Sequence, residues 1–234
     1  MTDPRQDSDS LVHSLVAWLR GVVAPGAHLV ADSRAVRPGD VFVALPGRRS
    51  DGRRHIGAAV AAGAAAVVSE AGGEAPACGV PTREVEGLSR CVGPLAAAWY
   101  GDPSSKLVVV AVTGTNGKTS CTQWIARGLA ESGRKAAVIG TLGSGIVEPG
   151  REGVALASFG LTTPDAISLQ RMLAAFVEAG VEVVAMEVSS IGIDQGRIDG
   201  LTVHTAVFTN FSRDHLDYHG DERAYLGAKL RLFA

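Results

Sequence analysis

The sequence has few cysteines and no long hydrophobic run. Its three cysteines lie far apart without Cys-x-x-Cys spacing, which argues against a disulfide framework or a zinc site. No stretch approaches the ~18 consecutive apolar residues of a membrane helix. The polar, acidic start MTDPRQDSDS lacks the basic and apolar regions of a secretory signal. We therefore expect a cytoplasmic protein without a membrane partner.

An excess of one charge is also lacking. The net charge is -2, so composition gives no reason to expect nucleic acid or an anionic membrane surface as a partner. Any recognition of phosphate must come from a local site. Aromatic residues make up only 5% of the chain, whereas glycine is abundant at 29 residues, which suits an α/β protein with many strand-to-helix turns. The 234 residues suffice for one large domain or two modest ones.

Two α/β units are expected along the chain. The first has helix- and strand-like segments that we place, in order, at 11–20, 41–45, 55–63, 64–70, 80–87 and 88–101. A stretch rich in proline and serine, Asp102 to Lys106, predicts the boundary between domains 1–104 and 105–234. The second unit alternates apolar strands with helices, which predicts a doubly wound, mostly parallel sheet. Its segments are expected at 107–112, 119–133, 135–140, 165–180, 181–188 and 203–210.

The segment VTGTNGKTS, residues 112–120, directly follows a buried strand and directly precedes a helix. A phosphate-binding loop needs this context, because its backbone N–H groups and the helix N-terminus face the anion. Lys118 can reach the β and γ phosphates, and the Thr119 hydroxyl can ligate Mg²⁺. Val112 stands where the strict P-loop pattern has its first glycine, so a plain glycine turn is the alternative. The strand, the GKT and the helix together favour nucleotide binding.

Other polar candidates each have a structural alternative. Glu187 ends a buried strand and could either ligate Mg²⁺ or cap a neighbouring helix. The TTPD segment, residues 162–165, could be only the start of a helix. The histidines and carboxylates at 214–219 could bind metal or form a polar surface loop. Lys229 could be an exposed helix lysine, in a helix that Asp221 would cap.

Several motifs, in their order and spacing, resemble the Mur ligases of peptidoglycan synthesis: TGTNGKTS, LTTPD, MEVSS, DQGRI, FTNFSRDHLDYHG and AYLGAK. DHLDYHG followed by YxxAK favours the MurE type. In the first domain, DSRAVRPGDVFVALPGRRSDGRRHI is similar to the segment that seats the uridine-diphosphate sugar. The resemblance begins at about Asp32. It implies a small N-terminal domain that binds UDP-MurNAc-peptide, followed by an incomplete P-loop domain, with the C-terminal Rossmann-like domain absent.

The resemblance also implies a role for individual residues. ATP is expected to bind to Gly114, Thr115, Asn116, Gly117, Lys118, Thr119 and Ser120. Catalytic roles are implied for Lys118, His215 and Lys229, and magnesium ligation for Thr119, Glu187, His215 and a carbamylated Lys229. A neutral lysine amine that captures CO₂ becomes an oxygen ligand suited to Mg²⁺. The UDP-sugar peptide is expected to contact Ser33, Arg48, Arg49, Ser50, Thr162, Thr163, Ser189, Gln195 and Arg197. Many relatives have histidine where this chain has Ile191, so no catalytic role is expected there.

The activity implied is that of an ATP-dependent amide ligase. Such an enzyme would add meso-diaminopimelate, with lysine as the alternative amino acid, to UDP-MurNAc-L-Ala-D-Glu through an acyl phosphate. A folylpolyglutamate-type ligase is an alternative, but the DSR…PGD pattern argues against it. Another alternative is a nucleotide- and sugar-binding fragment without turnover. The abrupt end at LRLFA favours it, because Leu230, Leu232 and Phe233 are expected to have nothing later to pack on.

Overall fold

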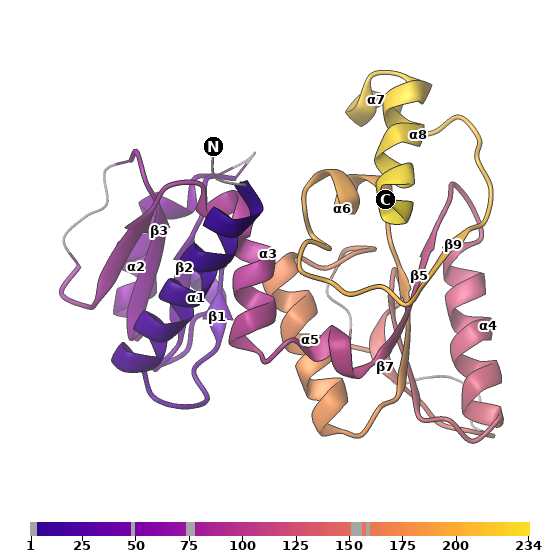
Figure 1. The fold of residues 1–234 in the computed structure, drawn as a ribbon, viewed down its shortest axis with the longest axis horizontal. Helices are drawn as coiled ribbons and strands as arrows, with labels where there is room; N and C mark the ends of the chain where they lie inside the picture. The colour runs from indigo at the N-terminus through magenta and orange to yellow at the C-terminus, as the bar shows by residue number, and fades with distance from the viewer. Residues whose placement is uncertain (1–3, 48–49, 74–77, 151–155, 158–159) are drawn as a thin grey trace. The chain divides into compact units, whose positions relative to one another are not determined.

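The computed structural model describes residues 4–47, 50–73, 78–150, 156–157 and 160–234 (Figure 1). The chain separates into two compact units, Met1–Trp99 and Tyr100–Ala234. The division therefore falls earlier than the proline- and serine-rich stretch. Pro103–Lys106 in that stretch is not a free link, because it forms the short 3-10 helix η3, which packs against a helix of the second unit.

The first unit is built on a four-stranded parallel sheet with the order β1-β2-β3-β4. Every residue of strand β2 is buried, as expected for a strand covered on both faces. Phe42 and Ala44 on this strand pack with Ile56 and Ala59 of helix α2. The elements are α1 (Pro4–Val22), β1 (Leu29–Val30), η1 (Ser33–Ala35), β2 (Val41–Ala44), η2 (Gly52–His55), α2 (Ile56–Ala61), β3 (Ala66–Glu70), β4 (Thr82–Val85) and α3 (Leu88–Trp99).

The second unit has a five-stranded sheet with the order β7-β6-β8-β5-β9. All neighbouring strands are parallel except β6 and β7, which are antiparallel. Helices α4 and α5 pack on opposite faces, because alternate residues of the strands join their separate apolar clusters. The elements are β5 (Val108–Thr113), α4 (Lys118–Glu131), β6 (Ala136–Gly140), β7 (Gly143–Val147), α5 (Ala166–Glu178), β8 (Val183–Glu187), α6 (Ser190–Asp194), β9 (Thr205–Phe208), α7 (Leu216–His219), α8 (Glu222–Leu230) and η4 (Arg231–Phe233).

The prediction of a doubly wound, mostly parallel sheet is confirmed, but two elements differ from the prediction. Strand β7 was missed, since GSGIV lacks a run of β-branched residues. A loop was predicted where α7 forms a short helix. Leu232 is buried in a core cluster with residues of α5, all of which precede it in the chain. Leu230 and Phe233 are exposed, as expected.

The carboxyl ends of β5, β8, β6 and β9 meet at one edge of this sheet. In the register, Val112 lies opposite Glu187, and Thr113 lies opposite Phe208. The loops that follow these strands therefore share the edge at which ligands bind in open α/β sheets. Among the described residues, no helix is both long and apolar enough to span a membrane.

Candidate functional site

The glycine-rich loop turns between β5 and α4 at this edge. Gly114 has φ +139° and Gly117 has φ +82°, which are conformations that other L-residues rarely adopt. A Cβ on Gly114 would also overlap the Thr209 hydroxyl. Val112, at the position of the missing first glycine, is a fully buried residue of β5 paired with β8. The strand simply continues there, so the turn needs no glycine at that point.

The segment after β9 holds the loop from one side. The Asn210 side chain pairs with both backbone groups of Asn116: it accepts from the N–H at 3.1 Å and donates to the C=O at 3.0 Å. The Thr209 hydroxyl donates to the same carbonyl at 2.7 Å. The Thr115 N–H donates to the Asn210 carbonyl at 2.9 Å. The conformation of the loop is therefore fixed by residues far away in the sequence.

Two lysines converge on the first carbonyl of the loop. Lys118 Nζ donates to the carbonyls of Gly114 and Thr115, each at 2.9 Å. Lys229 Nζ donates to the same Gly114 carbonyl at 2.9 Å from helix α8. Lys229 is only 1% exposed, so the alternative of an exposed helix lysine is wrong. The sequence placed Lys118 at this site by the loop pattern and Lys229 by resemblance, and the structure brings both to one oxygen atom.

The surroundings disfavour a positive charge on both lysines. Burial and, to a smaller extent, the charge of Lys118 together lower the pKa of Lys229 to about 8, against the opposing attraction of Asp214. Burial also lowers the pKa of Lys118, against the attraction of Glu187 and Asp214. An anionic ligand at the loop would offset both effects.

Glu187 is the buried acid of the site, 1% exposed at the end of β8. Its Oε2 accepts from the Thr119 hydroxyl at 2.9 Å, and its Oε1 accepts from the Thr141 N–H at 2.8 Å. A Cβ on Gly140 would overlap Glu187 Oε1, so the carboxylate fills the space beside that glycine. Glu187 does not cap a neighbouring helix but faces the phosphate loop.

The residues expected to bind the sugar peptide in the second unit are linked to Glu187. Thr141 Oγ1 lies 3.1 Å from Glu187 Oε2 and equally 3.1 Å from Thr162 Oγ1. The Thr163 hydroxyl donates to the Glu187 carbonyl at 3.2 Å and lies 3.1 Å from Ser189 Oγ. TTPD is thus more than a helix start, although its aspartate does cap α5.

Arg197 extends this network. Its Nη1 donates to the Thr163 carbonyl at 2.7 Å, and its Nε donates to Gln195 Oε1 at 3.0 Å. Burial lowers the pKa of Arg197 against the attraction of Asp165. The five residues predicted here, Thr162, Thr163, Ser189, Gln195 and Arg197, therefore form one connected group at the sheet edge.

His215 is less tightly held than the other predicted residues. It is the N-cap of α7 with φ +51°, and its side chain is 45% exposed. Its Nε2 lies 3.7 Å from Asp214 Oδ2, and its ring lies edge-on to Tyr225 with the centroids 6.0 Å apart. Across the described ranges, no group of three or more His, Cys, Asp or Glu side chains is arranged to hold a metal ion. His215 and Glu187 therefore do not form a ready-made cluster.

The first unit contains a cavity of about 540 Å³, lined in part by Ser33 and Ser50. Asp32 caps η1 and pairs with Arg34 in the cavity wall, with 2.7 Å between Arg34 Nη2 and Asp32 Oδ2. Ser50 Oγ lies 2.8 Å from His55 Nε2. The structure thus brings two of the predicted sugar-binding residues together. Arg48 and Arg49 lie outside the described residues.

Comparison with known proteins identifies the family. A profile described as Mur ligase middle domain matches residues 112–234, and one described as Mur ligase family, catalytic domain, matches residues 27–100. The chain belongs to the Mur ligase family. One match falls largely within each unit of this Mur ligase.

Curated relatives of this Mur ligase are about 50% identical to it. The UDP-N-acetylmuramoyl-L-alanyl-D-glutamate–2,6-diaminopimelate ligase of Ralstonia nicotianae is 51% identical over 223 residues, covering 92% of this chain and 42% of the relative. The protein of the same name from Pseudomonas aeruginosa is 50% identical over 211 residues, covering 88% and 42%. This chain therefore spans less than half the length of these relatives.

Solved structures show the same fold. A structure of UDP-N-acetylmuramoyl-L-alanyl-D-glutamate–2,6-diaminopimelate ligase has a TM-score of 0.75 and 32% identity, covering 93% of this chain and 44% of that chain. The MurF ligase from Thermotoga maritima, solved in complex with ADP, has a TM-score of 0.56 and 23% identity, covering 88% and 42%. Because the MurF ligase is only 23% identical to this chain, its similarity is evidence for the fold alone.

Sequence reasoning gave no role to four residues of the Mur ligase site: Gly140, Thr141, Asn210 and Tyr225. Thr141 follows the predicted strand 135–140 directly, so a hydroxyl at that edge was a signal that could have been used. Asn210 and Tyr225 were part of recognised motifs, but their contacts run to residues about a hundred positions away. Nothing in their local sequence indicates those partners.

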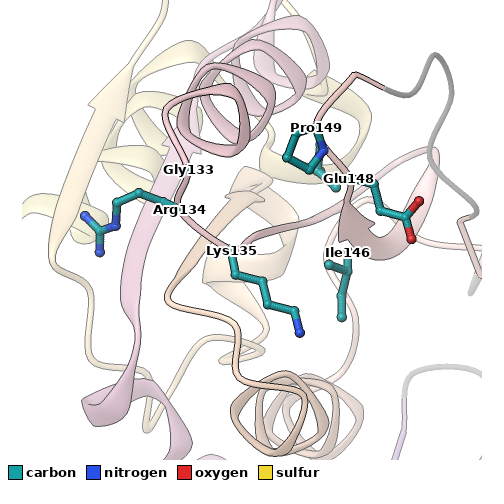
Figure 2. Close-up of a pocket in the computed structure, with 7 residues that line it drawn as sticks. Gly133, Arg134, Lys135, Ile146, Glu148 and Pro149 are labelled. Atoms are coloured by element: carbon teal, nitrogen blue, oxygen red, sulfur yellow. The ribbon is translucent and has the colours of Figure 1, made fainter.

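A second cavity, of about 410 Å³, lies at the amino end of β6, away from the phosphate loop (Figure 2). Its two basic residues already have partners. Arg134 pairs with Glu182 at 3.1 Å and, in Figure 2, points away from the other labelled side chains. Lys135 Nζ donates to the Ala179 carbonyl. This cavity is therefore not part of the candidate site.

Proposed function

We propose that this chain forms the ATP- and UDP-sugar-binding part of a MurE-type ligase of cytoplasmic peptidoglycan precursor synthesis. The complete enzyme would add meso-diaminopimelate to UDP-MurNAc-L-Ala-D-Glu. One observation carries the proposal: Glu187 links the phosphate-loop residue Thr119 to the threonines expected to hold the peptide. The names of the relatives support the choice of substrate and of amino acid. Since the chain spans about 42% of their length, turnover is assigned to the whole protein.

The donor atoms at Glu187 fit a magnesium ion. A carboxylate and a hydroxyl are the hard oxygen ligands that Mg²⁺ prefers, usually together with water and substrate phosphates. Thr119 Oγ1 and Glu187 Oε2 are 2.9 Å apart, so small rotations would let both face one cation. Magnesium held there would supply positive charge to the γ-phosphate. His215 is the candidate partner of a second ion.

The lysines fit two different tasks. Lys118 now donates to two loop carbonyls and could exchange them for phosphate oxygens, which are stronger acceptors. Lys229, with a pKa of about 8, keeps roughly a tenth of its amine neutral at pH 7. A neutral amine can attack CO₂, lose a proton and become a carbamate. The carbamate on Lys229 would offer its oxygen atoms as ligands to a cation.

The reaction would proceed by activation of the acyl group. The terminal carboxylate of the UDP-sugar dipeptide attacks the γ-phosphorus of ATP, which gives an acyl phosphate and releases ADP. The amine of the incoming diamino acid then attacks the acyl carbon, and phosphate leaves. In this scheme Arg197 and the hydroxyls of Thr162, Thr163 and Ser189 orient the peptide. Ser33, Ser50, Arg48 and Arg49 would hold the uridine diphosphate in the first unit.

The nucleotide site is tested by calorimetric titration of the chain with a non-hydrolysable ATP analogue and Mg²⁺. We expect saturable binding that Lys118→Met reduces at least tenfold, because a charged hydrogen-bond donor to phosphate is lost. Lys135→Met is the matched control, since Lys135 lines the remote cavity of Figure 2. Equal affinity in all three proteins would contradict the assignment of the loop.

A second candidate is binding of nucleotide and UDP-sugar by this chain without turnover. Mixing the chain with ATP, Mg²⁺, UDP-MurNAc-L-Ala-D-Glu and diaminopimelate separates the candidates. Release of phosphate with formation of the tripeptide would exclude the binding fragment. A folylpolyglutamate-type ligase would instead ignore the UDP-sugar and bind a folate.

A further inference from the structure

Tyr225 is a completely buried phenol on the inner face of α8. Its hydroxyl lies 3.1 Å from Thr115 Oγ1 in the phosphate loop. One helical turn further on, Lys229 Nζ lies 4.5 Å from the centre of the Tyr225 ring. Residues four apart on a helix share a face, so one side of α8 presents both groups to the loop.

The hydrogen bonds of Thr115 define the direction of this contact. Thr115 Oγ1 donates to the Ser212 carbonyl at 3.1 Å and accepts from the Ser212 N–H at 3.0 Å. A hydroxyl has one proton and two acceptor sites, so the remaining bond must be donated by Tyr225. A buried phenol needs such a partner, because an unpaired hydroxyl in the interior is costly. Thr115 thus points its side chain into the protein, and only its backbone borders the expected phosphate position.

Helix α8 therefore touches two consecutive residues of the loop. Lys229 bonds to the Gly114 carbonyl, and Tyr225 bonds to the Thr115 side chain. The ring of Tyr225 also contacts Phe211 and His219, with centroids 5.3 and 5.4 Å apart. The phenol is fixed on several sides, which limits how far the loop and the helix can move independently.

We propose that Tyr225 is a positioning residue that couples the phosphate loop to helix α8. Its hydroxyl holds Thr115 while its ring holds the side chain of Lys229, so a change in the loop on nucleotide binding is transmitted to that lysine. The inference rests on the proposed nucleotide site. It assigns Tyr225 no contact with substrate.

Tyr225→Phe keeps the ring and removes only the hydroxyl. Its expected effect depends on whether that hydroxyl only stabilises the fold or also couples the loop to α8. If the hydroxyl only stabilises the fold, the variant is less stable but responds to nucleotide as the parent does. If it couples the two elements, the response of α8 to nucleotide is lost while the loop still responds. The decisive measurement is therefore how much nucleotide changes α8 in the variant compared with the parent.

Amide hydrogen exchange of the chain, with and without ADP and Mg²⁺, measures that response. In the parent, nucleotide is expected to slow exchange in residues 113–120 and in residues 222–230. In Tyr225→Phe we expect the loop to be slowed as before and the slowing in α8 to fall at least threefold. ADP affinity is expected to fall by about three- to tenfold, the range for one net hydrogen bond.

A double-mutant cycle isolates the pair. Thr115→Val removes the acceptor with little change in shape, and Tyr225→Phe should then have no further effect on ADP affinity. Lys135→Met, which lines the remote cavity of Figure 2, is the control and should match the parent. Full slowing of α8 exchange in Tyr225→Phe, or additive effects in the cycle, would overturn the coupling while leaving the nucleotide site intact. No ADP binding by the parent would overturn both proposals.

Discussion

The phosphate loop of the second unit and the cavity of the first unit are held by contacts of different range. At the loop, the hydrogen bonds from the segment after β9 and from α8 join residues 93 to 115 positions apart. In the cavity wall Asp32 pairs with Arg34, and next to the lining residues Ser50 and Gly52 Asp51 pairs with Arg53; each pair is two positions apart. The loop is therefore a product of the folded sheet, whereas the cavity wall is shaped largely by short local turns.

The charges at the two places differ in the same way. In the first unit, Arg34 and Arg53 each pair with a carboxylate two positions away, and the hydrogen bond from Arg53 lowers the pKa of Asp51 to about 2. In the second unit, Lys118 and Lys229 donate to carbonyls, and burial lowers both pKa values. The first arrangement is electrostatically satisfied without a ligand. The second holds positive charge at a free-energy cost that a phosphate would offset.

Gly114→Ala should have the largest effect, because it adds a Cβ where the loop packs most closely against residues distant in the sequence. The new Cβ would overlap the Thr209 hydroxyl at a φ of +139°. We expect a loss of about 3 kcal/mol in the free energy of unfolding and no detectable nucleotide binding. Urea unfolding and calorimetry measure both quantities.

Gly128→Ala is the matched control, since Gly128 lies inside α4 with open space around it. It should raise the free energy of unfolding by about 0.5–1 kcal/mol and leave nucleotide affinity unchanged. Normal nucleotide binding by Gly114→Ala would show that the loop does not need its observed conformation.

Lys229→Met tests the cost of the buried charge. The pKa of Lys229 is lower in the folded than in the unfolded chain, so below pH 8 both states are protonated and the cost is fully present. As pH rises from about 8 to 10.5, the folded state loses its proton first, and this cost is relieved. At pH 7 the variant should therefore be more stable by about 2 kcal/mol, and the gap should narrow toward pH 10.

Urea unfolding at several pH values in CO₂-free buffer measures this gap. Lys135→Met, at an exposed lysine, is the control. A constant difference for Lys229→Met across the range would mean that its amine keeps an ordinary pKa.

Asn210→Asp should have an intermediate effect. The carboxylate can still accept from the Asn116 N–H but can no longer donate to the Asn116 carbonyl. It also places a negative charge beside the expected phosphate. We expect roughly a tenfold loss of nucleotide affinity in calorimetry. Thr209→Ser keeps its hydroxyl and should lose little nucleotide affinity. If it lost as much affinity as Asn210→Asp, the role of the two hydrogen bonds between the Asn210 side chain and the Asn116 backbone would be refuted.

The same difference in range explains what the sequence could predict. The parallel sheet, the phosphate loop and the cap Asp221 follow local patterns, and the structure contains them. Lys229 was placed at the site only by resemblance, because its local sequence equally suits an exposed helix position. The bidentate clamp of Asn210 and the burial of Tyr225 depend on where β9 and α8 pack. Such contacts are decided by tertiary structure, which residue spacing does not encode.

Arg34→Gln should give the smallest change in stability, because it removes only the exposed ion pair with Asp32, two positions away. The Arg34 side chain is 87% exposed, and ion pairs in such positions contribute little to folding. Its hydrogen bond lowers the pKa of Asp32, so that pKa should rise in the variant. The thermal unfolding midpoint, followed by circular dichroism, should stay within error of the parent.

Binding should be more sensitive to this change than stability. Arg34 lines the cavity beside Ser33, where a diphosphate could reach its guanidinium. Calorimetry with UDP should show about a fivefold loss of affinity, with nucleotide affinity at the second unit unchanged. Arg53→Gln is the informative partner, since Arg53 is half-buried and also donates to the Ala71 carbonyl, so it should lower the midpoint. If Arg34→Gln lowered the midpoint as much as Arg53→Gln, the cavity wall would depend on the surrounding fold as the phosphate loop does.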